Sequence, residues 1–149
     1  MARPDASILP SEAADALAHC YGCGPANPQG LHLTPRREGE VTVVDWQPAR
    51  VHAGWDTVVH GGLVAAFADE VAAFAFFGQE RVFGMTRALR VEYKRRVHWT
   101  RPVRGEGRVL RREERRAVVA VRVVQDGAVC TEGEVEFALM PEGPPPTSA

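Results

Sequence analysis

The chain has 149 residues, of which 45% are hydrophobic and 25% charged, so it has the size and composition of one globular domain and not of a disordered protein. The net charge of −1 gives no overall attraction to nucleic acid, and no apolar run approaches the roughly 20 residues that a membrane helix needs. Three cysteines are too few for a disulfide framework, and no apolar signal segment follows the N-terminus. These features predict a cytoplasmic protein without a membrane span.

The first third of the chain is predicted to be mostly irregular. Residues 1–10 are expected to be flexible, and residues 11–17 to form one or two helical turns. The segment 20–30, CYGCGPANPQG, holds three Gly and two Pro, which is typical of an ordered loop. Residues 31–33 are expected to begin a short strand and residues 41–46 to form a second, with Gly39 and Glu40 in the turn between them.

Residues 60–78 differ in kind, because they are rich in Ala and apolar nearly all round. This composition predicts a helix that is buried on most sides. A pair of glycines, Gly61 and Gly62, opens the segment, and Gly78 is expected to end the helix as its C′ residue.

The rest of the chain is expected to form β-structure. Alternation places Leu89, Val91 and Tyr93 on one face of the first strand, and the Asp-Gly pair at residues 126–127 predicts a tight hairpin. The expected strands span residues 85–97, 103–110, 117–124 and 128–139, with a charged turn at 111–116 and a flexible tail at 141–149.

Two strands, one long helix and four further strands predict an α+β fold, in which an antiparallel sheet wraps around one central helix. The length predicts a single domain, residues 1–149. One flank of the helix and the outer sheet edge would still need cover, so a homo-oligomer is expected.

Asp69 and Glu70 are the only ionisable residues between Gly62 and Gly78. A buried carboxylate costs several kcal/mol unless it has a partner or stays protonated. Neighbouring helical residues point in different directions, so one carboxylate can face a cleft while the other meets solvent or a charged partner. Asp69 follows Gly62 by about two turns on one face, and a helix N-terminus can bind an oxyanion. The pattern indicates a hydrolytic site, with ion pairs to arginines as the alternative.

Basic residues gather between Arg87 and Arg116, where twelve of them face four acidic ones. One interpretation is a surface that meets a polyanionic ligand such as a nucleotide phosphate. The other is that these residues occupy solvated faces and turns of strands.

The segment His60-Gly61-Gly62, followed by six residues and Asp69, resembles the signature of hotdog-fold thioesterases of the phenylacetyl-CoA thioesterase and thioesterase-superfamily type. The loop at 20–31 and the strand at 85–93 resemble segments of the same superfamily, so the likeness spans roughly residues 19–140. It implies a hotdog fold and hydrolysis of an acyl-CoA thioester. It also implies a homodimer or a dimer-of-dimers tetramer with sites at the dimer interface, and no metal or cofactor beyond the CoA of the substrate.

The resemblance also implies residue roles. The implied catalytic residues are Asp69 as general base or nucleophile, the Gly62 N–H as the group that polarises the carbonyl, His60 as a positioning residue, and Thr86 from the partner subunit as a holder of the water. The candidate substrate contacts are Gly61, Arg90, Lys94, Arg95 and Arg96. Residues 51–56 carry His52 and Asp56, where several relatives have Asn or Gln, so the group that assists the base stays open.

Two other functions, and two other roles for the pair Cys20 and Cys23, are alternatives. The fold also hosts acyl-CoA dehydratases, which use an Asp/His pair on a different motif, and a non-catalytic protein that binds acyl-CoA or a lipid-like ligand is also conceivable. Cys20 and Cys23 could form half of a zinc site or a redox pair. Because no second ligand pair follows and the motif does not open a helix, a loop packed by small residues is preferred.

Overall fold

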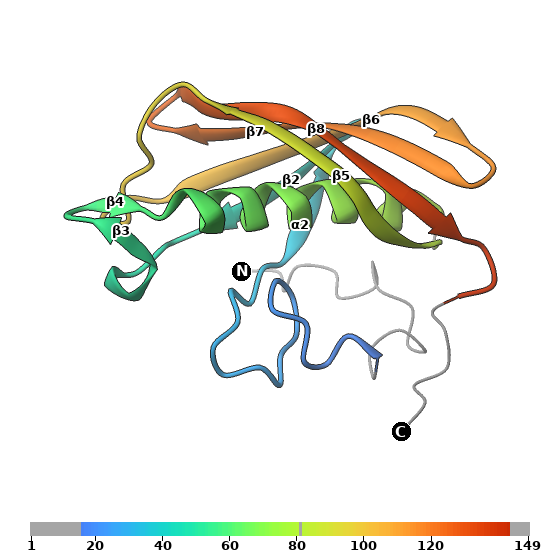
Figure 1. Cartoon of the computed structure of the whole chain (residues 1–149), viewed down its shortest axis with the longest axis horizontal. Helices are drawn as coiled ribbons and strands as arrows, with labels where there is room; N and C mark the ends of the chain where they lie inside the picture. Colours follow the sequence, from blue (N-terminus) through green and yellow to red (C-terminus); the bar gives the residue numbers. More distant parts are fainter. Residues whose placement is uncertain (1–15, 81, 144–149) are drawn as a thin grey trace.

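A computed structural model describes residues 16–80 and 82–143, in which one long helix lies against the concave face of a curved sheet (Figure 1). The main sheet has the order β1-β2-β6-β7-β8-β5 with antiparallel neighbours, and β3 pairs with β4. The elements are β1 (Pro35–Glu38), β2 (Val41–Trp46), the 3-10 helix η2 (Arg50–His52), β3 (Ala53–Trp55), β4 (Val58–Val59), α2 (Gly61–Glu80), β5 (Phe83–Tyr93), β6 (Val103–Glu113), β7 (Arg116–Gln125) and β8 (Ala128–Met140).

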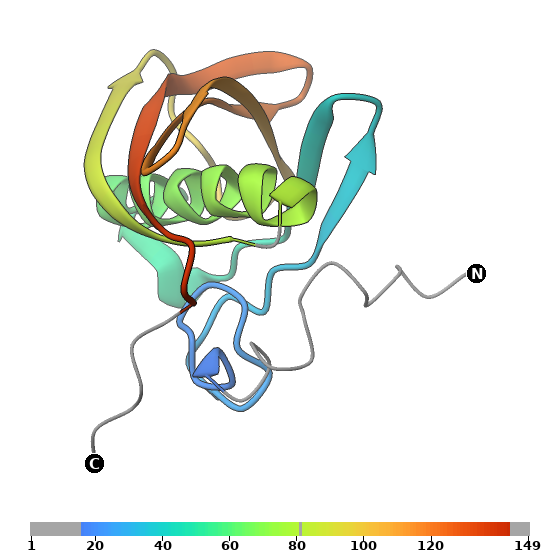
Figure 2. The same ribbon diagram turned by 90° about the vertical axis from the view of Figure 1, so that its right-hand side faces the viewer.

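The sheet curls around α2, as the end-on view shows (Figure 2). Phe67, Val71 and Phe74 of the helix are fully or almost fully buried, and they form the core with the inner faces of the strands. Gly105 of β6 permits this close packing, because a Cβ atom there would lie 2.4 Å from a methyl group of Val71 and 2.8 Å from the ring of Phe67. The predicted α+β hotdog architecture is confirmed.

Several boundaries differ from those expected. Helix α2 continues through Gly78 to Glu80, so the prediction that this glycine ends the helix was wrong. Residues 31–33 form no strand, because the N–H groups of Leu31 and Leu33 instead donate to the carbonyl oxygens of Tyr21 and Gly22, at 2.7 and 2.8 Å. The predicted Asp-Gly hairpin between β7 and β8 is confirmed, with positive φ at both turn residues. The predictions for residues 1–15 and 144–149 lie outside the described residues.

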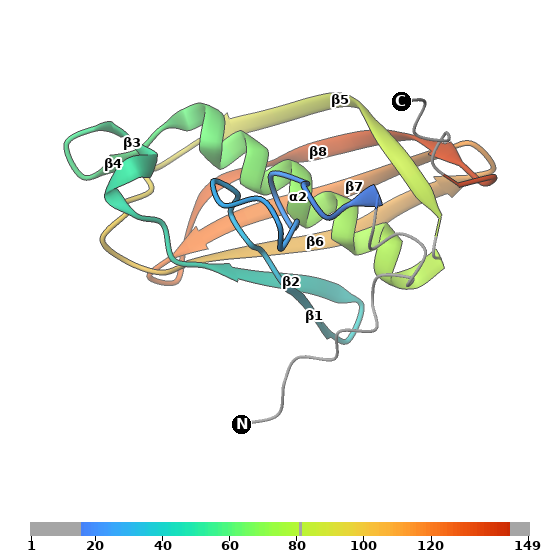
Figure 3. The ribbon, with the colours of Figure 1, turned by 90° about the horizontal axis from the view of Figure 1, so that it is seen from below.

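The N-terminal loop covers the side of α2 that faces away from the sheet (Figure 3). Its end is held there by the buried side chains of Leu31 and Leu33, which join the core, while Cys23 packs against the core from the edge. A flank that the sequence left open is thus partly closed by the chain's own loop.

Strand β5 forms one edge of the main sheet and exposes apolar side chains. Met85 is 61% exposed, Leu89 38% and Tyr93 53%. A long edge strand with apolar side chains is a surface on which another strand can pair. Among the described residues, no helix has the length and apolar character that crossing a membrane requires.

Candidate active site

The start of α2 is capped by His60. Its carbonyl oxygen accepts the N–H groups of Leu63 and Val64, at 2.9 and 3.1 Å, and its ring Nδ1 accepts the N–H of Gly62 at 3.0 Å. A ring nitrogen that accepts a hydrogen bond belongs to a neutral imidazole, so the proton lies on Nε2. The Gly62 amide assigned to the thioester carbonyl is therefore engaged by the chain's own histidine.

Tyr93 also meets the start of the helix, a contact that the sequence did not predict. Its hydroxyl donates to the carbonyl oxygen of Gly61 over 2.7 Å. This bond ties the end of β5 to the first turn of α2, which holds the backbone of Gly61 in place beside an open space.

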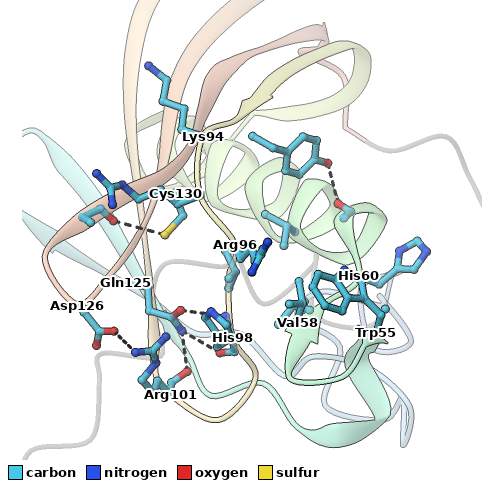
Figure 4. A pocket seen from close by; sticks show the side chains of 18 residues that line it. Trp55, Val58, His60, Lys94, Arg96, His98, Arg101, Gln125, Asp126 and Cys130 are labelled. Atoms are coloured by element: carbon cyan, nitrogen blue, oxygen red, sulfur yellow. Dashed lines mark hydrogen bonds and ion pairs between the residues drawn. The ribbon is translucent and has the colours of Figure 1, made fainter.

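That space is a pocket of about 940 Å³ between the helix start, the β3–β4 hairpin and the chain that follows β5 (Figure 4). Its lining includes Trp55, His60, Gly61 and Tyr93. Four cationic side chains line it as well: Lys94, Arg95, Arg96 and Arg101.

Two of these cations are already paired. Lys94 forms a salt bridge with Glu132, and Arg101 forms one with Asp126 at 2.8 Å. The guanidinium of Arg96 lies 5.2 Å from the centre of the Trp55 ring. Arg95 and Arg96 form no salt bridge with any residue in 16–80 or 82–143, so they leave positive charge at the helix start, where the helix dipole is also positive.

Asp69 lies about two turns after the start of α2, and it does not line this pocket. Its Oδ1 accepts a hydrogen bond of 2.7 Å from the hydroxyl of Thr86 on β5. Burial raises the pKa of the Asp69 carboxyl, and the hydrogen bond from Thr86 partly opposes that rise. The contact is made within one chain, so it needs no second subunit.

The other predicted residues have different surroundings. Arg90 lies on the outer face of the sheet, in a shallow hollow of about 480 Å³ that also holds Glu92, its salt-bridge partner at 3.7 Å. Glu70, for which an ion pair with an arginine was the alternative, faces the loop that carries Cys20. His52 accepts the N–H of Ala49 at 2.8 Å and serves as a structural residue.

The family model of the thioesterase superfamily matches residues 56–131, slightly more than half of the chain, and the matched region contains His60, Asp69 and Thr86. The chain belongs to the thioesterase superfamily. No curated protein matches the sequence.

Solved structures share the fold at low identity. A thioesterase superfamily protein is 23% identical with a TM-score of 0.69, and the match covers 83% of this chain and 63% of the length of that one. A phenylacetic acid degradation-related protein from Ralstonia eutropha JMP134 is 18% identical with a TM-score of 0.69, and the match covers 85% of this chain and 98% of that one. A hypothetical thioesterase from Streptococcus pneumoniae TIGR4, solved with coenzyme A, is 13% identical with a TM-score of 0.67, and the match covers 73% of this chain and 89% of that one.

Proposed function

We propose that this protein hydrolyses an acyl-CoA thioester to a free acid and CoA, with Asp69 as the general base. The observation that carries the proposal is the half-buried Asp69 carboxylate, which is held by the Thr86 hydroxyl and forms no salt bridge with any described residue. A carboxylate with a raised pKa is a better base near neutral pH, and an unpaired one is free to bind water.

In the proposed reaction, Asp69 takes a proton from a bound water while the water oxygen attacks the carbonyl carbon. The negative charge that develops on the carbonyl oxygen needs a hydrogen-bond donor. The carbonyl then re-forms as the C–S bond breaks, and the sulfur takes up the proton that Asp69 had accepted, so that CoA leaves as the free thiol. The start of α2 offers the donor, either the Gly62 N–H once the His60 ring turns away, or the Nε2–H of that ring.

One chain cannot supply both groups to one thioester. Asp69 lies seven positions after Gly62 in the helix, which corresponds to about 10 Å along the axis at about 1.5 Å per residue. A base and an oxyanion donor must both lie about 3 Å from the reacting group. We therefore propose a homodimer, as such or paired into a tetramer, in which two α2 helices run antiparallel and Asp69 of one copy faces Gly62 of the other.

The exposed edge of β5 supports this dimer. Pairing two β5 strands around a two-fold axis would extend the sheet across both copies and would cover Met85 and Leu89. In the same assembly, the pocket at the start of α2 would take the CoA part of the substrate, with its phosphates near Arg95 and Arg96.

The decisive experiment measures thiol release from a panel of acyl-CoA substrates by the purified protein and its variants. Asp69→Asn is expected to lower kcat by about two orders of magnitude or more, because it removes the proton acceptor but keeps the shape of the side chain. Glu70→Gln should cost far less, and Asp45→Asn on β2 should leave the rate unchanged. If Glu70→Gln had the larger effect, Asp69 would not be the base.

Assays of the wild-type protein distinguish the hydrolase from the other two classes of protein. Release of free CoA from at least one substrate supports the hydrolase. Binding of acyl-CoA without release would identify a ligand-binding protein, and hydration of an enoyl-CoA would identify a dehydratase; either result overturns the proposal.

A further inference from the structure

Two cysteines and a glutamate, distant in sequence, converge between the N-terminal loop and α2. The Sγ atoms of Cys20 and Cys23 and a carboxylate oxygen of Glu70 all lie within 4.8 Å of one another. Cys20 Sγ is 3.9 Å from Glu70 Oε1. This cluster lies on a different face of the helix from the contact between Asp69 and Thr86, and the proposed hydrolysis does not use it.

Glu70 is the unusual member of the cluster, because it is a mostly buried carboxylate without a cation. No lysine, arginine or histidine in 16–80 or 82–143 forms a salt bridge with it. The loop closes tightly over it: a Cβ atom on Gly22 would lie 2.3 to 2.6 Å from its side-chain atoms. Burial is the main cause that raises the pKa of Glu70 to about 7, followed by the charge of Cys20. The ionised form of such a group is costly to bury unless a positive charge is supplied.

The two cysteines of the loop differ, because the pKa of Cys20 is lowered and that of Cys23 is raised. A hydrogen bond with the Cys23 thiol is the main cause that lowers the pKa of Cys20, and backbone N–H groups of Gly22, Cys23 and Gly24 add to the effect. The turn is fixed by the bond from the Gly24 N–H to the Cys20 carbonyl, at 2.9 Å. Backbone donors directed at a cysteine sulfur stabilise the form that binds metals.

We propose that Cys20, Cys23 and Glu70 bind one thiophilic divalent cation of the zinc class, with solvent in the fourth position. Two thiolates and one carboxylate match the ligands that zinc prefers, at about 2.3 Å to sulfur and about 2.0–2.2 Å to oxygen. Tetrahedral coordination at those lengths brings the ligand atoms to roughly 3.5–3.8 Å from one another. The thiols would have to move inward by about an ångström or less and release their protons to solvent on binding.

The bound cation would fasten the loop to the helix that the loop covers, beside the turn that carries Asp69. A Cys20–Cys23 disulfide accounts for the cluster less well. It would form with the loss of two protons and two electrons to an oxidant, and it would leave the Glu70 carboxylate buried without a positive charge. The cation accounts for all three side chains.

The test uses the untagged full chain, stripped with a chelator and titrated with Co²⁺ and then Zn²⁺. The wild type is expected to show a thiolate-to-cobalt charge-transfer band that saturates at one equivalent and disappears when zinc displaces the cobalt. Elemental analysis after zinc loading should give one zinc per chain. Zinc should also protect two of the three cysteines from a thiol reagent, a readout that needs no substitution.

Variants assign the ligands. The double variant Cys20→Ser/Cys23→Ser should lose the cobalt band, and Glu70→Gln should weaken zinc binding by at least about tenfold. Cys130→Ser removes the buried cysteine outside the cluster and should bind like the wild type. The proposal is overturned if the double variant binds zinc as tightly as the wild type. It is also overturned if the wild type binds no metal and mild oxidation closes a Cys20–Cys23 disulfide.

Discussion

Asp69 and Glu70 are neighbours in the chain, but the helix turns them toward different surroundings. Asp69 meets the Thr86 hydroxyl on β5, whereas Glu70 meets the sulfur of Cys20. Burial is the main cause that raises the pKa of both carboxyls, so what distinguishes them chemically is the partner. A hydroxyl can hold a carboxylate and a water together, while a pair of thiols suits a metal ion.

The Thr86 hydroxyl stabilises the ionised form of Asp69. Without this hydroxyl, the Asp69 carboxyl should be harder to deprotonate. Thr86→Val is expected to raise the pKa of Asp69 and to move the acidic limb of the kcat/KM profile to higher pH. At pH values on that limb, loss of a hydrogen bond worth about 1 kcal/mol corresponds to a kcat/KM about fivefold lower. Thr86→Ser keeps the hydroxyl and should keep the profile. An acidic limb that does not move in Thr86→Val would show that the threonine does not act on the base.

The sequence made Asp69 recognisable, because a carboxylate in an apolar helix is conspicuous, but it did not predict how Thr86 reaches it. Strict alternation would place Thr86 on the outer face of β5 with Arg90. The register of β5 against β8 shifts between Thr86 and Ala88, and the extra residue turns the threonine toward the helix. Such an irregularity depends on pairing with a distant strand, so the local pattern does not reveal it.

At the scale of elements, the fit of α2 against β6 depends on a missing side chain. Gly105→Ala would place a methyl group 2.4 Å from Val71, so the helix or the strand would have to move. The expected result is a loss of about 1–3 kcal/mol in the free energy of unfolding, measured in urea. Gly61→Ala is the matched control, because the nearest atom to its added methyl lies at 3.8 Å. Equal stability of the two variants would contradict this account of the packing.

The sequence predicted the long helix and the four strands after it, because the apolar helix and the Asp-Gly hairpin are local signals, but it missed η2 and the β3–β4 hairpin. It was wrong about residues 31–33, whose apolar alternation suggested a strand. Their backbone groups are satisfied by the loop at Tyr21 and Gly22, and their leucines close the outer flank of α2. The third member of the metal cluster, Glu70, was hidden for the same reason, since its meeting with Cys20 depends on how a distant loop folds back.

The edge strand β5 yields a prediction about assembly. Leu89→Lys places a charge in the proposed dimer contact and should give a monomer in size-exclusion chromatography with light scattering. Thiol release should fall with it, because the proposed site needs two copies. Leu110→Lys changes a leucine of β6 that is more exposed, at 49%, and should leave the dimer intact. A Leu89→Lys protein that remains dimeric would place the interface elsewhere.

At the scale of the whole molecule, charge is unevenly distributed. The net charge is −1, yet four cationic side chains line the pocket at the start of α2. Several other basic residues form salt bridges with acidic residues of the sheet: Arg104 pairs with Glu38 at 2.6 Å, and Arg122 pairs with Glu106 at 2.7 Å. Arg95 and Arg96 form no such pair within the described residues. These two arginines therefore leave positive charge where the CoA phosphates are proposed to bind.

This uneven charge predicts that salt changes KM more for a substrate that carries the nucleotide phosphates than for one that lacks them. Raising the ionic strength should increase KM for acyl-CoA by about threefold to tenfold, because salt screens the attraction between the phosphates and the pocket. Acyl-pantetheine carries the same thioester without the nucleotide phosphates, so its KM should respond little. Arg96→Gln should reduce the salt response for acyl-CoA, whereas Arg108→Gln on β6, outside the pocket, should keep it. The same salt response for both substrates would mean that the phosphates bind away from this pocket.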